Sequence, residues 1–323
     1  MTAPAQSARS LISLDDVRDA QRRLGTRVHR TPVLTSESVA TAARCRLSFK
    51  AELFQRTGSF KVRGVLNRLL TLPSDAMRPG LVTLSAGNHG AALAWAAHAA
   101  GTRATVVMPA TAVPSKVAAV RAYGGEPVLT QGNLLERCEA LQRERGLTLV
   151  HPFDDPMIIA GQGTLGLELL DDLPELEAVV VPVGGGGLIS GVAVAVKRQR
   201  PAIRVIGVEP TGADVMSQSL AAGSPARLDR PQTVADGLAA PFAGVLTFAH
   251  VRALVDDVVR VEDDAIIRAL RLILERLKLV VEPAGAAALA GVLSGAVPVE
   301  PDARVVCVLS GGNVDPGVLK RLL

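Results

Sequence analysis

The sequence predicts an α/β protein whose sheets are mostly parallel and covered by helices. Five apolar runs rich in β-branched residues, at 81–85, 104–109, 178–183, 203–209 and 304–310, each lie next to a helical pattern. Continuous apolar strands that alternate with helices are typical of a parallel sheet buried on both faces. Of the 323 residues, 48% are hydrophobic and 20% charged, which is enough apolar material for two domains or one large unit.

Two series of strands predict two lobes with a cleft between them. The runs between 81 and 150 form one compact series, and the runs from 178 onward form another. We therefore expect residues 76–151 to form a small domain, and residues 1–75 plus 152–323 to form a large one. No internal repeat or long linker is present, and we expect no appended regulatory domain after the last glycine-rich turn.

The first helix is predicted from Ser13-Leu14-Asp15-Asp16 to a stop at Gly25, and no apolar targeting segment precedes it. Residues 178–196 carry no charge over 19 positions, a length that could span a membrane. Because a proline and four consecutive glycines interrupt this run, we interpret it as a strand, a turn and a helix. We expect a soluble protein without membrane contacts.

Composition argues against further classes of protein. The net charge is +4 and the basic residues are scattered, while one Trp, one Tyr and six Phe offer few rings for bases to stack on. We therefore expect no nucleic-acid partner. Three cysteines, at 45, 138 and 307, lie far apart, which fits neither a disulfide framework nor a CxxC metal motif. This usage is typical of the reducing cytoplasm, where we expect the protein to act.

Lys61, in the stretch TGSFKVRG at residues 57–64, is the first candidate for chemistry. The chain has only six lysines against many arginines, and this one is flanked by apolar residues. A lysine can lose its proton when desolvated and attack a carbonyl, which an arginine cannot do. On this stretch alone, a solvated charge at a strand end is the more ordinary interpretation.

Three glycine-rich turns each follow a predicted strand. They are SAGNHG at 85–90, GGGG at 184–187 and SGGN at 310–313. Ligands of doubly wound sheets bind at the carboxyl ends of the strands, and a glycine turn that opens a helix aims free N–H groups at an anion. Turns in any α/β protein are rich in glycine, but four in a row exceed what turning requires. We predict an anion site there.

A dinucleotide is the first alternative for this anion, since Glu209 follows Gly187 at the distance of a ribose-binding acid. The G-x-G-x-x-G spacing fails, because its third position falls on Ile189 or Ser190. Motifs of P-loop proteins, zinc proteases and serine hydrolases are also missing from the sequence. A carbonyl-attacking lysine, one turn for a phosphate and another for a carboxylate instead match pyridoxal phosphate acting on an amino acid.

Eight motifs then resemble, in order, the serine/threonine dehydratase and serine racemase family. This family belongs to fold type II of the pyridoxal-phosphate enzymes, which is tryptophan synthase β-like. The resemblance covers nearly the whole chain and implies two lobes, a large one that binds the cofactor and a small one that binds the substrate carboxylate. We expect a homo-oligomer, either a dimer or a tetramer. The motifs are TPVL (31–34), GSFKVRG (58–64), SAGNHG (85–90), HPFDDP with AGQGT (151–164), PVGGGGL (182–188), GVEP (207–210), ADG (235–237) and SGGNVD (310–315).

The resemblance assigns roles to individual residues. Lys61 is similar to the lysine that forms the internal aldimine and then shuttles the Cα proton, and Phe60 to the residue beside the cofactor ring. Asn88 resembles the partner of the phenolic oxygen, and Ser310 the partner of the pyridine nitrogen. A hydroxyl partner leaves the pyridine neutral, which favours β-elimination over transamination. The phosphate would be held by Gly184, Gly185, Gly186, Gly187 and Leu188, and the substrate carboxylate by Ser85, Ala86, Gly87 and His89.

The implied activity is that of a threonine/serine ammonia-lyase. It would convert an L-β-hydroxy amino acid, L-threonine and/or L-serine, to a 2-oxo acid and ammonia. Four alternatives stay open: a dehydratase of 3-hydroxyaspartate or a related β-hydroxy amino acid, a serine racemase, a Rossmann-type oxidoreductase that needs no pyridoxal phosphate, and a catalytically silent amino-acid sensor.

Two departures from the racemase-like branch of the family sharpen these expectations. That branch carries an acidic cluster for a divalent cation after GVEP, but Val215 stands here where a second aspartate would follow Glu209 and Asp214. A hard cation needs several oxygen ligands, so we expect no metal. That branch also has a second serine in its carboxylate turn, where this chain has Ala86. Without that hydroxyl to protonate the opposite face, we expect little racemisation.

Overall fold

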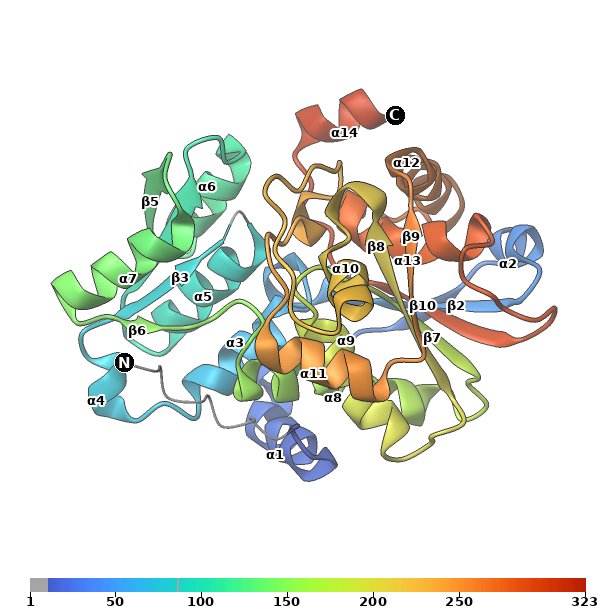
Figure 1. The fold of residues 1–323 in the computed structure, drawn as a ribbon, viewed down its shortest axis with the longest axis horizontal. Coiled ribbons are helices and arrows are strands. Elements are labelled where there is room, and N and C mark those ends of the chain that lie inside the picture. The colour runs from blue at the N-terminus through green and yellow to red at the C-terminus, as the bar shows by residue number, and fades with distance from the viewer. Residues whose placement is uncertain (1–10, 86) are drawn as a thin grey trace.

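The computed structural model of this chain, described for residues 11–85 and 87–323, contains two sheets that lie side by side (Figure 1). The larger sheet has six strands in the order β1-β2-β10-β7-β8-β9. Only β1 runs antiparallel to its neighbour, and the other pairs are parallel. The strands are β1 (Val33–Thr35), β2 (Arg46–Ala51), β7 (Ala178–Pro182), β8 (Arg204–Pro210), β9 (Asp257–Val261) and β10 (Arg304–Leu309).

The smaller sheet has four parallel strands in the order β5-β4-β3-β6 and is formed by one continuous segment of the chain. It lies at the left of Figure 1, with α5 and α7 beside it. The strands are β3 (Leu81–Leu84), β4 (Ala104–Pro109), β5 (Glu126–Thr130) and β6 (Thr148–Leu149). The predicted α/β fold with two mostly parallel sheets is confirmed, while the domain boundaries at 75/76 and 151/152 stay predictions.

Helices cover both faces of the larger sheet. Alternate residues of β7 and β10 point to opposite faces, so that Val180 and Cys307 contact one layer while Val179 and Val306 contact the other. The first layer contains α2 (Glu37–Ala43), α12 (Asp263–Leu272) and α13 (Pro283–Leu293). The second contains α8 (Pro156–Asp172), α9 (Gly187–Lys197), α10 (Val215–Ala222) and α11 (Val245–Leu254).

The remaining helices surround the smaller sheet or lie near the chain ends, except for a π-helical turn that follows α12. Ser13 caps the first helix with a capping box and Gly25 ends it, as predicted. Among the described residues, no helix is both long and apolar enough to cross a membrane. The remaining helices are α1 (Leu14–Leu24), α3 (Lys61–Leu69), α4 (Ser74–Met77), α5 (Asn88–Ala99), α6 (Pro114–Ala122), α7 (Leu134–Arg145), α14 (Pro316–Leu322) and the π-helical turn Ile273–Leu277.

Glycines bring α3 and α8 into close contact. A Cβ at Gly161 would lie 2.6 Å from the carbonyl oxygen of Arg63, and a Cβ at Gly64 would lie 2.8 Å from the carbonyl oxygen of Ile158. Such distances leave room only for hydrogen, which explains the two glycines at this helix crossing. Because α3 begins at Lys61, this packing fixes the position of the candidate lysine.

A buried network of charges also holds α3. The guanidinium of Arg63 donates to Glu52 at 2.8 Å and to Glu168 at 2.7 Å. All three side chains are buried. Lys50 joins the network through Glu168 at 2.7 Å, and it also donates to the carbonyl of Thr31. Each charge meets an opposite charge and further hydrogen bonds, which is the condition under which buried ion pairs persist.

Five strands were not predicted, namely β1, β2, β5, β6 and β9. Strand β2, with the sequence RLSFKA, places the charged Lys50 in the core, which a reading of apolar runs does not anticipate. The strand forms because the network above neutralises that charge. The predicted strands end within one residue of the observed ones, and the cysteines at 45, 138 and 307 are free and buried.

Candidate functional site

A cavity of about 700 Å³ opens where the carboxyl ends of β3, β7 and β10 face one another. The amino ends of α3, α5 and α9 reach the same cavity, as expected for parallel strands followed by helices. Of the residues predicted from the sequence, all but Ala86 line it, and Ala86 lies outside the described residues. Those that line it are Phe60, Lys61, Ser85, Gly87, Asn88, His89, Gly184, Gly185, Gly186, Gly187, Leu188 and Ser310.

Main-chain bonds to the end of β10 place Lys61. The amide of Phe60 donates to the carbonyl oxygen of Ser310 at 3.1 Å, and Ser59 forms an antiparallel bridge with Gly311. The segment that precedes α3 therefore behaves as a short extra strand against the turn after β10. As a result, Lys61 and Ser310 lie in one cavity although 249 positions separate them in the sequence (310 − 61).

The side chain of Lys61 is part-buried and has little compensation for its charge. Its Nζ donates to the carbonyl oxygen of Pro152 at 3.2 Å and lies 5.2 Å from the centre of the Phe60 ring. Desolvation lowers the pKa of Lys61 to about 8, against an opposing effect of the Glu282 carboxylate. Lys61 is thus a helix residue in a cavity, and the solvated charge at a strand end that its local stretch alone favoured is wrong.

The four glycines form the turn between β7 and α9. Gly186 has φ +87°, which favours glycine, and a Cβ at Gly185 would overlap the ring of Phe153. Within the described chain no side chain caps α9, and its first turn contains no acidic residue. The free N–H groups and the positive end of an 11-residue helix consequently face the cavity, an arrangement that suits a phosphate.

A second turn follows β3. The hydroxyl of Ser85 accepts a hydrogen bond from the amide of Gly87 at 3.0 Å, which shapes the entry into α5. His89 is buried and its Nε2 lies 3.2 Å from the carbonyl oxygen of Val150. Burial, with the nearby Lys61, holds the pKa of His89 well below its usual value, so the imidazole is neutral. A neutral ring here contributes hydrogen bonds and no charge.

Glu282 and Asn313 are site residues that the sequence prediction missed. Glu282 lines the cavity and accepts from Asn88 at 2.6 Å, while Asn313 donates to the other end of the same amide at 2.8 Å. Asn313 belongs to the quoted SGGNVD motif, but no role was given to it. Glu282 precedes the Pro283 that opens α13, and a glutamate before an apolar helix looks like an ordinary surface cap in the sequence.

The cavity mouth carries further groups. Lys116 of α6 forms an ion pair with Asp236, which joins the two sides of the cleft. Phe153 and Phe242 lie with ring centres 5.4 Å apart, and the guanidinium of Arg227 lies 5.2 Å from the Phe242 ring. The two rings and the guanidinium of Arg227 therefore combine an apolar wall with a positive charge.

The acidic residues considered for a metal lie elsewhere. Both carboxylate oxygens of Glu209 accept from the start of α10, at 2.8 Å from the amides of Met216 and Ser217. Asp214 forms an ion pair with Arg260 at 3.2 Å. No group of three or more His, Cys, Asp or Glu with metal-binding geometry occurs in the described part of the chain. The absence of metal dependence stays a prediction.

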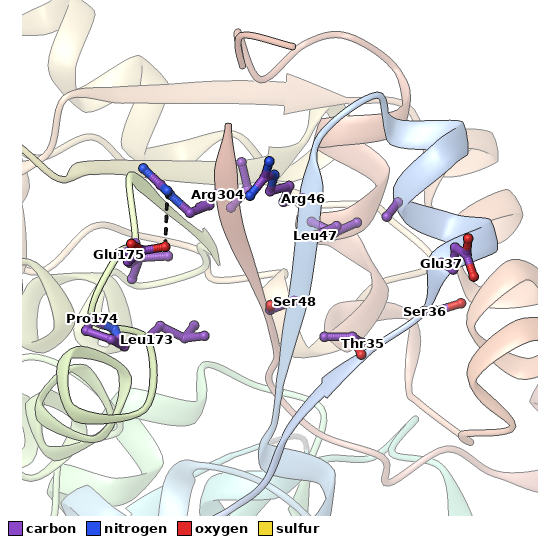
Figure 2. A pocket seen from close by; sticks show the side chains of 13 residues that line it. Thr35, Ser36, Glu37, Arg46, Leu47, Ser48, Leu173, Pro174, Glu175 and Arg304 are labelled. Carbon is purple, nitrogen blue, oxygen red and sulfur yellow. Dashed lines mark hydrogen bonds and ion pairs between the residues drawn. The ribbon is translucent and has the colours of Figure 1, made fainter. Parts of the chain in front are cut away.

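A second cavity, of about 520 Å³, lies at the opposite ends of the strands (Figure 2). It is lined by the starts of β2 and β10 and by the loop before β7, and Arg304 pairs there with Glu175 at 3.2 Å. None of the residues predicted from the sequence lines it. The chemistry predicted from the sequence therefore belongs to the first cavity.

The residues of the first cavity fit pyridoxal phosphate. The glycine turn offers a cradle in which a side chain would collide, and the amino end of α9 suits the phosphate. A desolvated lysine is available for the aldehyde, and Ser310, directly after β10, lines the same cavity. Asn88 has an amide hydrogen to spare for a further acceptor.

Comparison with known proteins agrees with this fit. A family model described as pyridoxal-phosphate dependent enzyme matches residues 25–311. The chain is 44% identical over 322 residues to a serine racemase of Oryza sativa subsp. indica, covering 98% of this chain and 95% of that protein. It is 45% identical over 302 residues to an L-threonine ammonia-lyase of Geobacter sulfurreducens, covering 93% and 75%. It also resembles the structure of maize serine racemase, with a TM-score of 0.91, 42% identity and 97% of each chain covered.

Proposed function

The chain belongs to the family of pyridoxal-phosphate-dependent enzymes, and we propose that it is an ammonia-lyase for an L-β-hydroxy amino acid. The products are a 2-oxo acid and ammonia, and the proposed substrates are L-threonine and L-serine. One observation carries the proposal: Lys61, with a pKa of about 8, opens into the same cavity as the glycine turn before α9 and the turn after β3. Because the family uses pyridoxal phosphate, the nicotinamide-dependent alternative is set aside.

Residues of this chain supply the binding and the proton transfer. When bound, pyridoxal phosphate supplies an electron sink for the bonds at the substrate Cα. We assign the amino end of α9 to its phosphate and the turn that contains Ser85 and Gly87 to the substrate carboxylate. Lys61 Nζ would hold the cofactor and then take the Cα proton, since a pKa of about 8 leaves more free base near neutral pH than an ordinary lysine has.

The walls of the cavity support a small, partly apolar substrate. Phe153 and Phe242 pack against each other beside the glycine turn, and Leu134 and Leu135 line the same cavity. Such walls favour the methyl group of threonine, by about 1 kcal/mol for one buried methylene-sized group. We therefore propose that L-threonine has the higher kcat/KM of the two substrates.

Serine racemase is the second candidate, because proteins of that name are as similar to this chain as the ammonia-lyase is. Inversion at Cα needs a proton carrier on each face of the planar centre. Lys61 serves one face, and an alanine at position 86 has no proton for the other. We propose elimination as the dominant reaction for this reason.

The test follows both outcomes in one reaction. The holoenzyme is incubated with L-serine and with L-threonine, and 2-oxo acid and the D- or allo-isomer are measured together. We expect 2-oxo acid to exceed inverted amino acid at least tenfold. Inverted amino acid that accumulates as fast as 2-oxo acid would show a racemase instead, and neither product from any β-hydroxy amino acid, 3-hydroxyaspartate included, would indicate a sensor.

A further inference from the structure

The side-chain amide of Asn88 is held at both ends. Its Nδ2 donates to Glu282 Oε1 at 2.6 Å, and its Oδ1 accepts from Asn313 Nδ2 at 2.8 Å. Asn313 Nδ2 donates its other hydrogen to the carbonyl oxygen of Thr57, at 2.7 Å. These bonds fix which way the Asn88 amide points, and they leave one Nδ2 hydrogen of Asn88 for another acceptor.

The three residues come from three separate parts of the fold. Asn88 opens α5 of the smaller sheet, Glu282 precedes α13, and Asn313 follows β10. The amide of Glu282 donates to the carbonyl oxygen of Gly311 at 3.1 Å, which ties the glutamate to the same turn that carries Asn313. A Cβ at Gly311 would lie 2.7 Å from Glu282 Oε1, so the glycine makes room for the carboxylate.

A glutamate at position 282 is expected to lower the free energy of unfolding. Its side chain is 2% exposed, and within the described chain its Oε2 has no hydrogen-bond partner. A buried carboxylate oxygen without a partner costs free energy of folding, so a merely structural contact would be served better by a neutral side chain. Folding alone therefore does not explain a glutamate at this position, whose other oxygen, Oε1, accepts from Asn88 at 2.6 Å.

We propose that Glu282 and Asn313 are positioning residues that form a clamp on Asn88 and present its remaining Nδ2 hydrogen to an acceptor oxygen of the ligand in the cavity. The inference rests on the proposed function, in which that acceptor is the phenolic oxygen of pyridoxal phosphate. The clamp explains why an asparagine at the start of a helix needs partners from two other elements. Without them, its amide is free to turn over and to present its oxygen to the ligand.

The chain provides a matched control. Asn67 of α3 is also a buried amide held at both ends, by Arg23 Nε at 2.9 Å and by the carbonyl oxygen of Met157 at 2.7 Å. It does not line the cavity. Loss of Asn67 should affect folding alone, whereas loss of a clamp residue should affect cofactor binding.

The experiment measures the dissociation constant of pyridoxal phosphate for the apoprotein and the melting temperature without cofactor. We expect Glu282→Ala and Asn313→Ala each to raise the dissociation constant at least tenfold. Glu282→Gln, whose amide oxygen still accepts from Asn88, should stay within about threefold of the wild type. Asn67→Ala should leave the dissociation constant unchanged and lower the melting temperature.

A double-mutant cycle shows whether Glu282 acts through Asn88. In the Asn88→Ala background, Glu282→Ala should cause no further loss of affinity, and additive losses would overturn the clamp. Borohydride reduction of the wild-type holoprotein separates the two proposals. If Lys61 is labelled while the clamp variants bind normally, the clamp alone is wrong. If Lys61 is not labelled, the proposed function is wrong, and the proposed role of the clamp in binding pyridoxal phosphate is wrong as well.

Discussion

Lys50 and Lys61 both lie away from bulk solvent, but they differ in how many partners compensate the charge of the ammonium group. Lys50 is fully buried and meets Glu168 at 2.7 Å, Asp172 at 3.5 Å and the carbonyl oxygen of Thr31. Lys61 has one carbonyl oxygen at 3.2 Å, and no carboxylate of the described residues lies within ion-pair distance of it. The first lysine belongs to a network in which every charge is matched, and the second is left short of partners.

This contrast separates structure from chemistry. The matched network, which joins Lys50 and Arg63 to Glu52 and Glu168, fixes α3 against α8 through buried ion pairs. The unmatched pair of Lys61 and Glu282 has pKa values of about 8 and about 7, shifted from ordinary values mainly by desolvation. Perturbed groups of this kind are concentrated at functional sites.

The largest expected effect is on activity, at Lys61. We expect Lys61→Ala to reduce β-elimination by about 10³-fold or more, because the base is lost. The apoprotein should melt at the wild-type temperature or higher, since an undercompensated charge is removed. Turnover with a panel of β-hydroxy amino acids measures the loss of activity, and calorimetry measures the melting temperature. Near wild-type turnover would refute the assignment of Lys61 as the base.

The matched network should respond in the opposite way. Arg63→Met leaves Glu52 and Glu168 buried without their cation, so we expect a loss of about 3–5 kcal/mol in the free energy of unfolding. Arg145→Met, which breaks the exposed pair with Glu126, is the control and should cost about 1 kcal/mol or less. Urea titrations measure both. Equal losses would show that the buried network does not stabilise α3.

Glu282 should make the stability of the apoprotein depend on pH. Its pKa is raised from 4.5 to about 7 by burial, with Asp236 acting in the same direction and Lys116, Asn88 and Lys61 opposing. A raised carboxyl pKa contributes stability that is fully present below about 4.5 and is lost as the pH rises through about 7.

Glu282→Gln removes this titration. The apoprotein of this variant should therefore gain stability relative to the wild type between pH 5 and pH 8, by on the order of 1–3 kcal/mol. Chemical unfolding at several pH values measures the difference. A difference that does not change with pH would mean that Glu282 titrates normally.

Arg227 tests whether the cation at the cavity mouth selects the substrate. We expect Arg227→Gln to change kcat/KM for L-threonine and L-serine by less than about threefold, because their side chains carry no charge. For 3-hydroxyaspartate, whose second carboxylate would meet the guanidinium, we expect about a tenfold loss. A large loss with threonine would place Arg227 in the proposed reaction and not at its entrance.

The smallest effect is expected from chelation. Glu209 and Asp214 already have partners from the protein, like the residues of the matched network. Exhaustive dialysis against a chelator should therefore change activity and melting temperature little. A large loss that magnesium or calcium restores would show that these acids form a cation site.

The sequence by itself determined the fold class and the glycine-rich turns that line the candidate cavity. Apolar strand runs are local signals, since a strand buried on both faces must be apolar along its whole length. The glycine turns are local too, because backbone that approaches a ligand or another chain segment excludes a side chain. Lys61 became a candidate from its own stretch of sequence, whereas Asn88 and Ser310 received their roles from the resemblance to the family.

Only the tertiary structure decided which charges are matched. Nothing around Lys50 in the sequence distinguishes it from a surface lysine, because Glu168 lies 118 positions away (168 − 50) and meets it only when α8 packs on β2. Glu282 likewise becomes a site residue only because the turn after β10 brings it to Asn88, 194 positions earlier. Desolvation and pairing depend on the whole fold, so the pKa values on which the chemistry rests cannot be read from any local segment.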